Sequence, residues 1–421
     1  MRRKVFLALS ALLGIVIGLV LSAGSALAAG EGVSGSLRNE GKPVEGVKIV
    51  VEKADGGPVG EATSGPDGRW KVDLPEAGSY KVRLDQKSLP EGVTLRDEDR
   101  DELSVVVASG QVKPVIFALG KGTRKTTGEF SRAMQLTVEG LRFGLIIALA
   151  SLGLSVIYGT TGLTNFAHGE LVTFGALVAF WFNVSSGLPF VVAAILTVIV
   201  AAIGGALLDL GFWRWLRRRG TGLIAMMIVS IGLSIFLRYV FLVLFAGGTR
   251  TYEGFGGQTA LNLGPVVLDQ KDIVSMLIAV VVLALVSFAL VYTRIGKATR
   301  AVADNPPLAA ASGIDVERVI NIVWIVGAAL AGLSGVLLGL AQQVNYQMGF
   351  QILLLVFAAV TLGGLGTAYG AILGSIVVGL FIQLSTLVIP SELKNVGALG
   401  VLILILLVRP QGILGRAQRV G

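Results

Sequence analysis

The sequence predicts a polytopic α-helical membrane protein, with about nine transmembrane helices and an exported β-sandwich domain at its N-terminus. The 421 residues are 53% hydrophobic and only 15% charged. Their mean hydropathy is +0.78, which is too apolar for a soluble globular protein. Long apolar segments follow residue 133, and the stretch before them has the short alternation of strands. The chain has no cysteine, which excludes disulfides, thiolate metal sites and a lipid anchor on cysteine.

Residues 1–29 have the features of an export signal. Residues 2–4 form a basic head, residues 5–21 an apolar core, and Ala26-Leu27-Ala28 a small-x-small cleavage site. An uncleaved first transmembrane helix is the alternative, because about 17 apolar residues are just enough to span a bilayer. We expect the segment that follows to lie outside the cytosol.

Residues 30–119 are predicted to form the extracytoplasmic domain. Residues 30–110 hold 16 acidic and 11 basic side chains, whereas the whole chain has a net charge of +8. Turn sequences at residues 55–58 and 65–68 separate short strands, which is typical of a small β-sandwich. The expected strands are residues 47–52, 69–74, 80–84, 104–107 and 112–119.

Three stretches of this domain, residues 41–49, 63–70 and 78–82, resemble the turn and core positions of carboxypeptidase regulatory-like domains. The resemblance implies a non-catalytic sandwich that serves as a spacer or docking module. Because the segment has no His or Cys, it cannot form a Ser-His-Asp or Cys-His catalytic group. Residues 120–132 are polar and are predicted to be a linker to the transmembrane domain, residues 133–421.

Nine apolar segments are expected to cross the membrane: residues 137–158, 166–184, 188–212, 222–246, 273–293, 319–341, 351–367, 370–389 and 393–408. With the sandwich outside, an odd number of spans leaves the C-terminus in the cytosol. The loops then assigned to the cytosol hold eleven Lys and Arg residues and the outer loops only three, which satisfies the positive-inside rule. Arg142 and Arg238 fall within spans and are expected to snorkel to the outer interface, although Arg238 could instead line a path.

A polar cluster, Asn165, His168 and Glu170, lies between the first two spans and contains the only histidine of the chain. The predicted spans place it near their cytosolic end. Polar groups are costly in a bilayer, so these side chains could line a substrate pathway. Alternatively, they could hydrogen-bond to backbone groups that are freed where the helix breaks near Gly162 and Gly169. Both interpretations stay open.

Glycines recur at every fourth position in the later spans, which predicts close helix packing. They are Gly335, Gly339, Gly366, Gly370 and Gly374. The run from Thr361 to Gly366 could also break a helix and form a re-entrant turn.

Residues 294–318 form the longest internal polar loop, which is expected in the cytosol. A short helix is predicted at residues 308–312, with Pro307 in its first turn, Asp304 or Asn305 as its cap, and Gly313 as its stop. Such a helix could insert into a groove of a partner. An ordinary solvated loop is the alternative.

Seven stretches in this order carry a family resemblance: residues 153–159, 165–170, 231–237, 296–303, 313–320, 327–332 and 410–415, together with the glycine-rich residues 362–366. They resemble the permease subunits of the high-affinity branched-chain amino acid ABC importers. The resemblance implies a subunit, and not an enzyme, of an ATP-driven importer for branched-chain or related hydrophobic amino acids in the bacterial inner membrane.

The resemblance also implies the partners: two cytosolic ABC ATPases, a second and paralogous permease, and an extracytoplasmic solute-binding protein. No cofactor, metal or nucleic acid is expected. The chain itself has no Gly-Lys followed by Ser or Thr, as a Walker A loop requires, so ATP must be bound by a partner.

The loop at residues 294–318 corresponds to the family's coupling helix. Its candidate coupling residues are Arg294, Arg300, Asp304, Leu308, Ala311, Gly313 and Arg318. The family often starts this helix with an acidic residue, whereas this chain has Pro307-Leu308-Ala309. Contact with the ATPase could therefore depend on shape and on the arginines.

Two alternatives remain. A permease for urea or short amides shares very similar motifs. A stand-alone secondary transporter belongs to a different class and normally has paired ionisable groups at mid-membrane. Only His168 and Glu170 are candidates for such a pair, which argues against that class.

Overall fold

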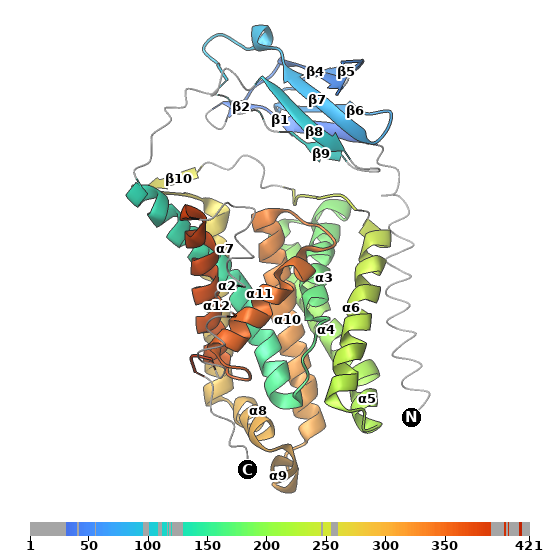
Figure 1. Cartoon of the computed structure of the whole chain (residues 1–421), viewed down its shortest axis with the longest axis vertical. Helices are drawn as coiled ribbons and strands as arrows, with labels where there is room; N and C mark the ends of the chain where they lie inside the picture. The colour runs from blue at the N-terminus through green and yellow to red at the C-terminus, as the bar shows by residue number, and fades with distance from the viewer. Residues whose placement is uncertain are drawn as a thin grey trace.

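The computed structural model describes residues 31–39, 42–54, 56–95, 101–107, 112–115, 117, 119, 129–245, 247–253, 260–388, 400, 403 and 412–414. A β-rich domain lies beyond one end of a helical bundle (Figure 1). The expected signal at residues 1–29 lies outside the described residues, as do most of the linker and, apart from residues 400 and 403, the last expected span at residues 393–408.

The N-terminal domain has two sheets, with strand orders β6-β1-β9 and β5-β4-β7-β8, and a short β2-β3 pair. All pairings are antiparallel except that of β1 with β9. The elements are β1 (Gly32–Ser36), β2 (Arg38–Asn39), β3 (Lys42–Pro43), β4 (Lys48–Lys53), β5 (Pro58–Thr63), β6 (Arg69–Asp73), β7 (Gly78–Leu84), η1 (Gln86–Ser88), β8 (Glu102–Val107) and β9 (Val112–Pro114).

Alternation along the strands builds the core between these sheets. In β6, Trp70 and Val72 are buried and the residues between and beside them are exposed, as expected for a strand with one face in a core. Both join one hydrophobic cluster with Ile49 of β4 and Tyr80 of β7. The Trp70 ring covers Gly35, where a Cβ would lie 2.7 Å from two ring carbons. Glycine at this position therefore lets the indole reach the core.

Four of the five expected strands correspond to β4, β6, β7 and β8. The fifth is shorter than expected, because β9 ends at Pro114. Strands β1 and β5 were not predicted. Their sequences, GVSGS and PVGEAT, contain the Gly and Pro residues that weaken the sequence signal of a strand.

The membrane domain contains α2 (Glu129–Thr161), α3 (His168–Phe180), η2 (Trp181–Ser185), α4 (Phe190–Leu208), η3 (Asp209–Trp213), α5 (Arg214–Arg218), α6 (Leu223–Phe245), β10 (Ala260–Leu263), β11 (Val266–Asp269), α7 (Gln270–Tyr292), α8 (Arg294–Asp304), α9 (Pro306–Ala311), α10 (Val316–Gln342), α11 (Met348–Gly363), α12 (Ala368–Leu384) and η4 (Ser385–Leu387). The β10-β11 hairpin and the α8-α9 pair lie at opposite ends of the bundle (Figure 1).

The expected count of nine transmembrane helices is not confirmed. Within the described part of the chain, six helices are long and apolar enough to cross a membrane: Glu129–Thr161, Phe190–Arg218, Leu223–Phe245, Gln270–Tyr292, Val316–Gln342 and Ala368–Leu387. The segment expected at residues 166–184 overlaps α3, of 13 residues, which continues directly into the π-helical turn η2 up to Ser185. The segment expected at residues 351–367 overlaps α11, of 16 residues. Each of these helices begins after a break in the chain, and neither is among the six long apolar helices.

Helices α2 and α10 form the buried centre of the bundle and run antiparallel. Ser334 Oγ of α10 donates to the Ile146 carbonyl at 2.8 Å, and a Cβ on Gly153 would lie 2.6 Å from Gly327 O. Helix α12 packs on α2 through Gly144, where a Cβ would lie 2.9 Å from Ser375 O. Backbones at this separation exclude larger side chains, as in other membrane helix contacts.

Four of the five glycines that recur at every fourth position meet other backbone or side-chain atoms directly. An added Cβ would overlap the Val172 carbonyl at Gly335, the Gly363 carbonyl at Gly370 and the Ala359 carbonyl at Gly374, and would lie 2.6 Å from Tyr252 Oη at Gly339. Gly366 differs, because it lies in the turn between α11 and α12 with φ +78°. Its role is thus to reverse the chain.

Candidate functional site

The first break in the bundle separates α2 from α3. Gly162 has φ +68°, and residues 163–167 then run back along α2 until His168 Nε2 lies 2.9 Å from the Ala150 carbonyl. Ala150 lies 11 residues before the end of α2, or about 16 Å at 1.5 Å per residue. His168 is therefore near the middle of the bundle. Its expected position at the end of the first two spans is wrong, because an extended segment covers more distance per residue than a helix.

The backbone of this break is satisfied by local side chains. Asn165 is buried, and its Oδ1 accepts a hydrogen bond from Ala167 N at 3.0 Å. Ser230 Oγ of α6 accepts from Phe166 N at 3.0 Å. The Asn165 side chain thus stabilises the turn that leads into α3, as expected of polar groups that satisfy irregular backbone inside a membrane.

Glu170, in the first turn of α3, pairs with Arg238 of α6. Its Oε1 accepts from Arg238 Nη2 at 3.1 Å, from Arg238 Nε at 3.3 Å and from Ser234 Oγ at 3.0 Å. The Arg238 guanidinium also lies 3.7 Å from the centre of the Phe350 ring at the start of α11. Arg238 therefore does not snorkel outward as expected, because a buried carboxylate offers it a partner inside the bundle.

Arg142 is likewise paired and does not depend on snorkelling. Its Nη1 lies 2.5 Å from Asp272 Oδ1, in the first turn of α7. Asp272 is largely buried, so the pair joins α2 to α7 near the β10-β11 end of the bundle.

A second break, between α10 and α11, repeats the geometry of the first. Gln343 has φ +74° directly after α10, as Gly162 has after α2. Asn345 Oδ1 accepts from Gln347 N at 2.9 Å, which matches the bond from Ala167 N to Asn165 Oδ1. Asn345-Tyr346-Gln347-Met348-Gly349 therefore corresponds to residues 165–169 of the first break.

The two breaks meet at the N-termini of α3 and α11. Gly349 N donates to Thr173 Oγ1 at 3.0 Å, and a Cβ on Gly169 would lie 2.7 Å from Gly349 O. Because α2 and α10 are antiparallel, the two units are related as inverted repeats. Transporters with such repeats form their substrate sites near mid-membrane, where discontinuous helices of the two repeats meet.

The α8-α9 pair forms the second candidate site. Thr293 Oγ1 accepts from Gly296 N at the start of α8, and Asn305 Oδ1 accepts from Leu308 N at the start of α9 at 3.0 Å. Gly313, with φ +88°, follows α9. The expected short helix is present, starts two residues earlier than predicted, and has Asn305 as its cap. Helix α8 was not predicted, although Thr293 and the spacing of Gly296, Thr299 and Val302 give it an N-cap and a buried face.

The candidate coupling residues mostly face outward. Leu308 is 66% exposed, while the next residue, Ala309, is buried and anchors α9. Arg294, Asp304, Ala311, Gly313 and Arg318 are also exposed. Arg300 differs, because its guanidinium donates to the Leu290 and Val291 carbonyls at the end of α7. It therefore holds α8 against α7.

A charged cluster beside this pair was not recognised in the sequence. Asp209 is completely buried and lies in the π-helical turn η3. Its carboxylate accepts from Arg217 Nη2 at 2.7 Å and from Asn321 Nδ2 at 3.1 Å. Glu317, in the first turn of α10, binds Arg214 Nε at 2.8 Å. The cluster joins the end of α4 to the start of α10, directly after α9 and Gly313.

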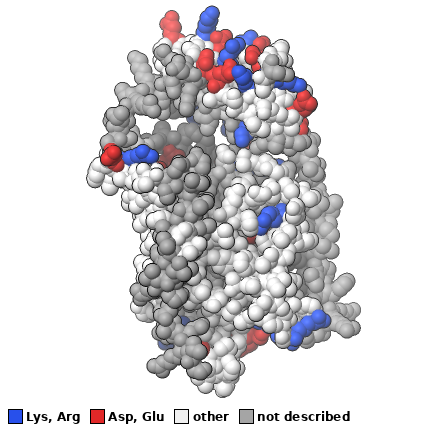
Figure 2. All heavy atoms as spheres, viewed as in Figure 1, with Lys and Arg blue, Asp and Glu red and all other residues white. Residues whose placement is uncertain are grey.

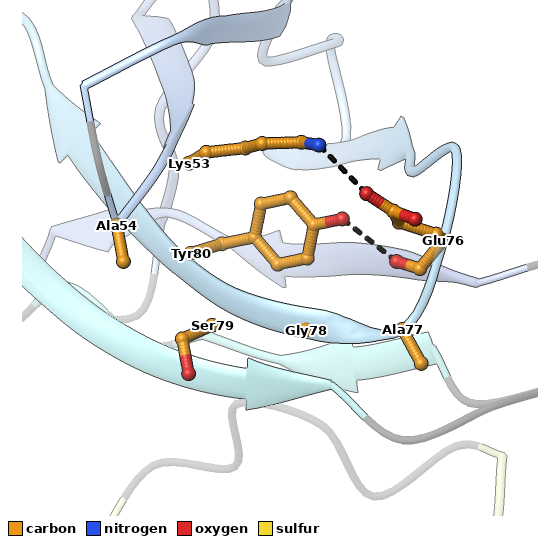
Figure 3. Close-up of a pocket in the computed structure, with 7 residues that line it drawn as sticks. All are labelled: Lys53, Ala54, Glu76, Ala77, Gly78, Ser79 and Tyr80. Atoms are coloured by element: carbon orange, nitrogen blue, oxygen red, sulfur yellow. Dashed lines mark hydrogen bonds and ion pairs between the residues drawn. The ribbon is translucent and has the colours of Figure 1, made fainter.

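A shallow pocket of about 270 Å³ lies on the N-terminal domain (Figure 3). Lys53 Nζ binds Glu76 Oε1 at 2.6 Å, and Tyr80 Oη donates to the Glu76 carbonyl at 2.7 Å, so its polar groups already pair with one another. Among the described residues, no group of three or more His, Cys, Asp or Glu side chains could hold a metal ion. Neither observation indicates a catalytic site.

The known proteins that resemble this chain match its helical part. The family described as "Branched-chain amino acid transport system / permease component" matches residues 136–407. LivH of Escherichia coli (strain K12), a high-affinity branched-chain amino acid transport system permease protein, is 33% identical over 304 residues, covering 69% of this chain and 98% of that protein. BraD of Pseudomonas aeruginosa, of the same description, is 31% identical over 69% of this chain and 98% of that protein.

A more distant relative is LivM of Escherichia coli (strain K12), a permease protein of the same described system, which is 26% identical over 66% of this chain and 70% of that protein. Among solved structures, PsaBC from Streptococcus pneumoniae in complex with Fab has a TM-score of 0.38 and 16% identity, covering 65% of this chain and 91% of that chain. At this TM-score the two structures are not similar enough to indicate a shared fold or function.

Proposed function

Because the chain belongs to the permease component family of branched-chain amino acid transport systems, we propose that it is the membrane subunit of an ATP-driven importer for branched-chain or related hydrophobic amino acids. In this proposal two cytosolic ABC ATPases supply the energy, and an extracytoplasmic binding protein delivers the amino acid. A second, paralogous permease completes the path. The relatives LivH and LivM, two different permease proteins of one described system, support the paralogous pair.

The proposed orientation places the α8-α9 end in the cytosol. The described basic residues at that end include Arg214, Arg217, Arg294, Arg300 and Arg318, whereas those at the β10-β11 end are few. This asymmetry supports the positive-inside orientation. The N-terminal domain then lies outside, preceded by the proposed signal peptide.

The proposed contact between α9 and the ATPase is supported by one observation: Leu308 projects from a short, well-capped helix. Ala309 and the Asn305 cap hold α9 in place, and Leu308 presents an apolar side chain that is 66% exposed. A rigid projecting helix suits insertion into a groove on a partner. In this role α9 transmits the movement of the ATPase through Gly313 to α10.

Leu308→Asp tests this contact. A charge at the tip of α9 should reduce the amount of ATPase that co-purifies with the permease at least tenfold, because it cannot be buried in an apolar groove without a large penalty. Leu261→Asp, at an exposed leucine of β10, is the matched control and should keep the ATPase bound. Full co-purification of the Leu308→Asp variant would remove the assignment of α9 as the contact.

Substrate class is tested separately by competition. In cells with the complete transporter, unlabelled leucine, isoleucine and valine should compete with labelled leucine for uptake, whereas urea and acetamide should not. Competition by urea or acetamide alone would replace the amino acid assignment by a short-amide permease.

The β-sandwich is proposed to be a carboxypeptidase regulatory-like domain that serves as a docking module outside the cell. Its separate hydrophobic core and the start of the family match at residue 136 support an independent domain. Deleting residues 31–119 should therefore leave the fold of the membrane domain intact.

A further inference from the structure

We infer that the surface formed by Arg238, Phe350, Gln351 and Leu354 lines the path of the transported amino acid, and that Arg238 holds its carboxylate. We call these four residues the mid-depth surface. The inference rests on the proposed function and names the part of the chain that contacts the substrate.

The mid-depth surface lies deep within the bundle. Arg238 is bound to Glu170, which follows His168 by two residues, and His168 hydrogen-bonds to Ala150, 11 residues before the end of α2. Arg238 also lies seven residues before the end of α6, or about 10 Å. The partner of this guanidinium in the structure is the buried carboxylate of Glu170 and not a headgroup at an interface.

The exposure of these side chains is incompatible with a surface that faces only lipid. Phe350 is 45% exposed and Leu354 is 52% exposed, and Gln351 between them is exposed as well. The side chain of Arg238 is 18% exposed beside the Phe350 ring. Phenylalanine and leucine tolerate lipid, but an amide and a guanidinium at this depth are found next to water or other protein groups.

The space-filling view shows charge on an otherwise mostly uncharged face of the bundle (Figure 2). The visible face of the bundle consists mostly of uncharged atoms, and basic atoms reach the surface between its two ends (Figure 2). Such a charge marks a pathway more readily than a lipid contact.

The hydrogen bonds of Arg238 leave part of its guanidinium available. Nε and Nη2 donate to Glu170, and Nη2 also approaches Ser234. Among the described residues no hydrogen bond or ion pair involves Nη1, and this atom is not among the buried atoms that lack a partner. A guanidinium fixed on one side by a carboxylate can still bind a second carboxylate with its outer N–H groups.

The chemistry of the mid-depth surface fits a hydrophobic amino acid. The substrate carboxylate would accept from Arg238 Nη1, and its apolar side chain would lie against Phe350 and Leu354. Glu170 neutralises much of the arginine charge, which would keep the affinity low enough for release. The position beside both helix breaks agrees with the midplane sites of inverted-repeat transporters.

Single-cysteine variants test whether the surface faces water, because the chain has no cysteine of its own. Leu354→Cys is compared with Leu285→Cys, which replaces a leucine of α7 that is 62% exposed and is proposed to face lipid. Both are treated, in cells with the complete transporter, with a membrane-impermeant methanethiosulfonate. We expect the cysteine at position 354 to react at least tenfold faster and to be protected by excess leucine. Equal, slow reaction at both positions would overturn the inference.

A charge comparison tests Arg238 itself. The cysteine at position 354 should react faster with an anionic methanethiosulfonate than with a cationic one. Arg238→Gln should lower that ratio by about threefold or more, because it removes one unit charge that attracts the anionic reagent and repels the cationic one. Combining Arg238→Gln with Glu170→Gln removes both charges and provides a second variant in case the single change prevents folding. Because the Arg238 side chain is partly exposed and that of Glu170 is completely buried, the double variant should also lower the ratio, but by less than the single variant. A ratio that neither variant changes would overturn the role of Arg238.

ATP-driven leucine uptake is measured in the same cells with the unmodified chain. If that uptake is present while position 354 stays unreactive, the pathway inference fails and the proposed function stands. If ATP-driven uptake is absent from the unmodified chain, the proposed function fails.

Discussion

Arg238→Met removes the cation from a carboxylate whose side chain is completely buried. Two of the three hydrogen bonds that end on Glu170 Oε1 come from Arg238, so only the bond from Ser234 would remain. Removing one partner of a buried ion pair costs about 3–5 kcal/mol, because the remaining charge keeps its desolvation penalty and loses its partner. Since Arg238 is itself partly exposed, we expect a loss near the lower limit, about 3 kcal/mol.

The double variant Arg238→Met with Glu170→Gln separates the buried charge from the loss of packing. It leaves no ion at the site, so it should lose less than about 1 kcal/mol. Equilibrium unfolding of the purified permease in mixed detergent micelles would measure both values. Arg294→Met, at an exposed arginine, serves as the control and should change the free energy of unfolding by less than about 0.5 kcal/mol. If Arg238→Met were no more destabilising than this control, Glu170 would not depend on Arg238.

Four further outcomes are expected. Gly335→Leu should destabilise the bundle by more than about 3 kcal/mol, because its side chain would overlap the backbone of α3. Gly232→Leu, on an open face of α6, is the control and should be tolerated. Equilibrium unfolding of both variants measures the difference. Gly313→Val should strain a residue at φ +88° by about 1–2 kcal/mol and lower the amount of leucine transported per ATP hydrolysed. An equal ratio of transport to hydrolysis in the variant and the parent would contradict the proposed role of Gly313 in linking α9 to α10. Asp209→Ala should cost about 3 kcal/mol, because it leaves buried arginine groups with one carboxylate fewer, and its melting temperature relative to the parent chain would show this. Residues 31–119 expressed alone should give a β-type circular dichroism spectrum and a cooperative melt, and a spectrum of an unfolded chain would contradict an independent domain.

Several features of the fold follow from periodicity and local signals in the sequence. The apolar segments that became α2, α4, α6, α7, α10 and α12 are long enough to predict a span directly. The Asn305-Pro306-Pro307 sequence and Gly313 predict the limits of α9, because capping and a positive φ depend on local chemistry. Buried Trp70 and Val72 follow from alternation in β6.

Other features depend on contacts between distant segments. Hydropathy does not distinguish a continuous helix from an extended segment followed by a half-helix, so the depth of His168 was predicted wrongly. Arg238 was expected at the interface because its partner, Glu170, lies 68 positions away. The local similarity of residues 165–169 to residues 345–349 is a signal that a search for internal repeats could detect.

The most direct test of the central claim is leucine uptake into proteoliposomes that contain the permease pair with its ATPases. The account predicts uptake only when ATP is enclosed on the ATPase side and the binding protein is present outside, and no uptake with a proton gradient alone. Uptake driven by a proton gradient in vesicles that contain the permease without ATPases would contradict it.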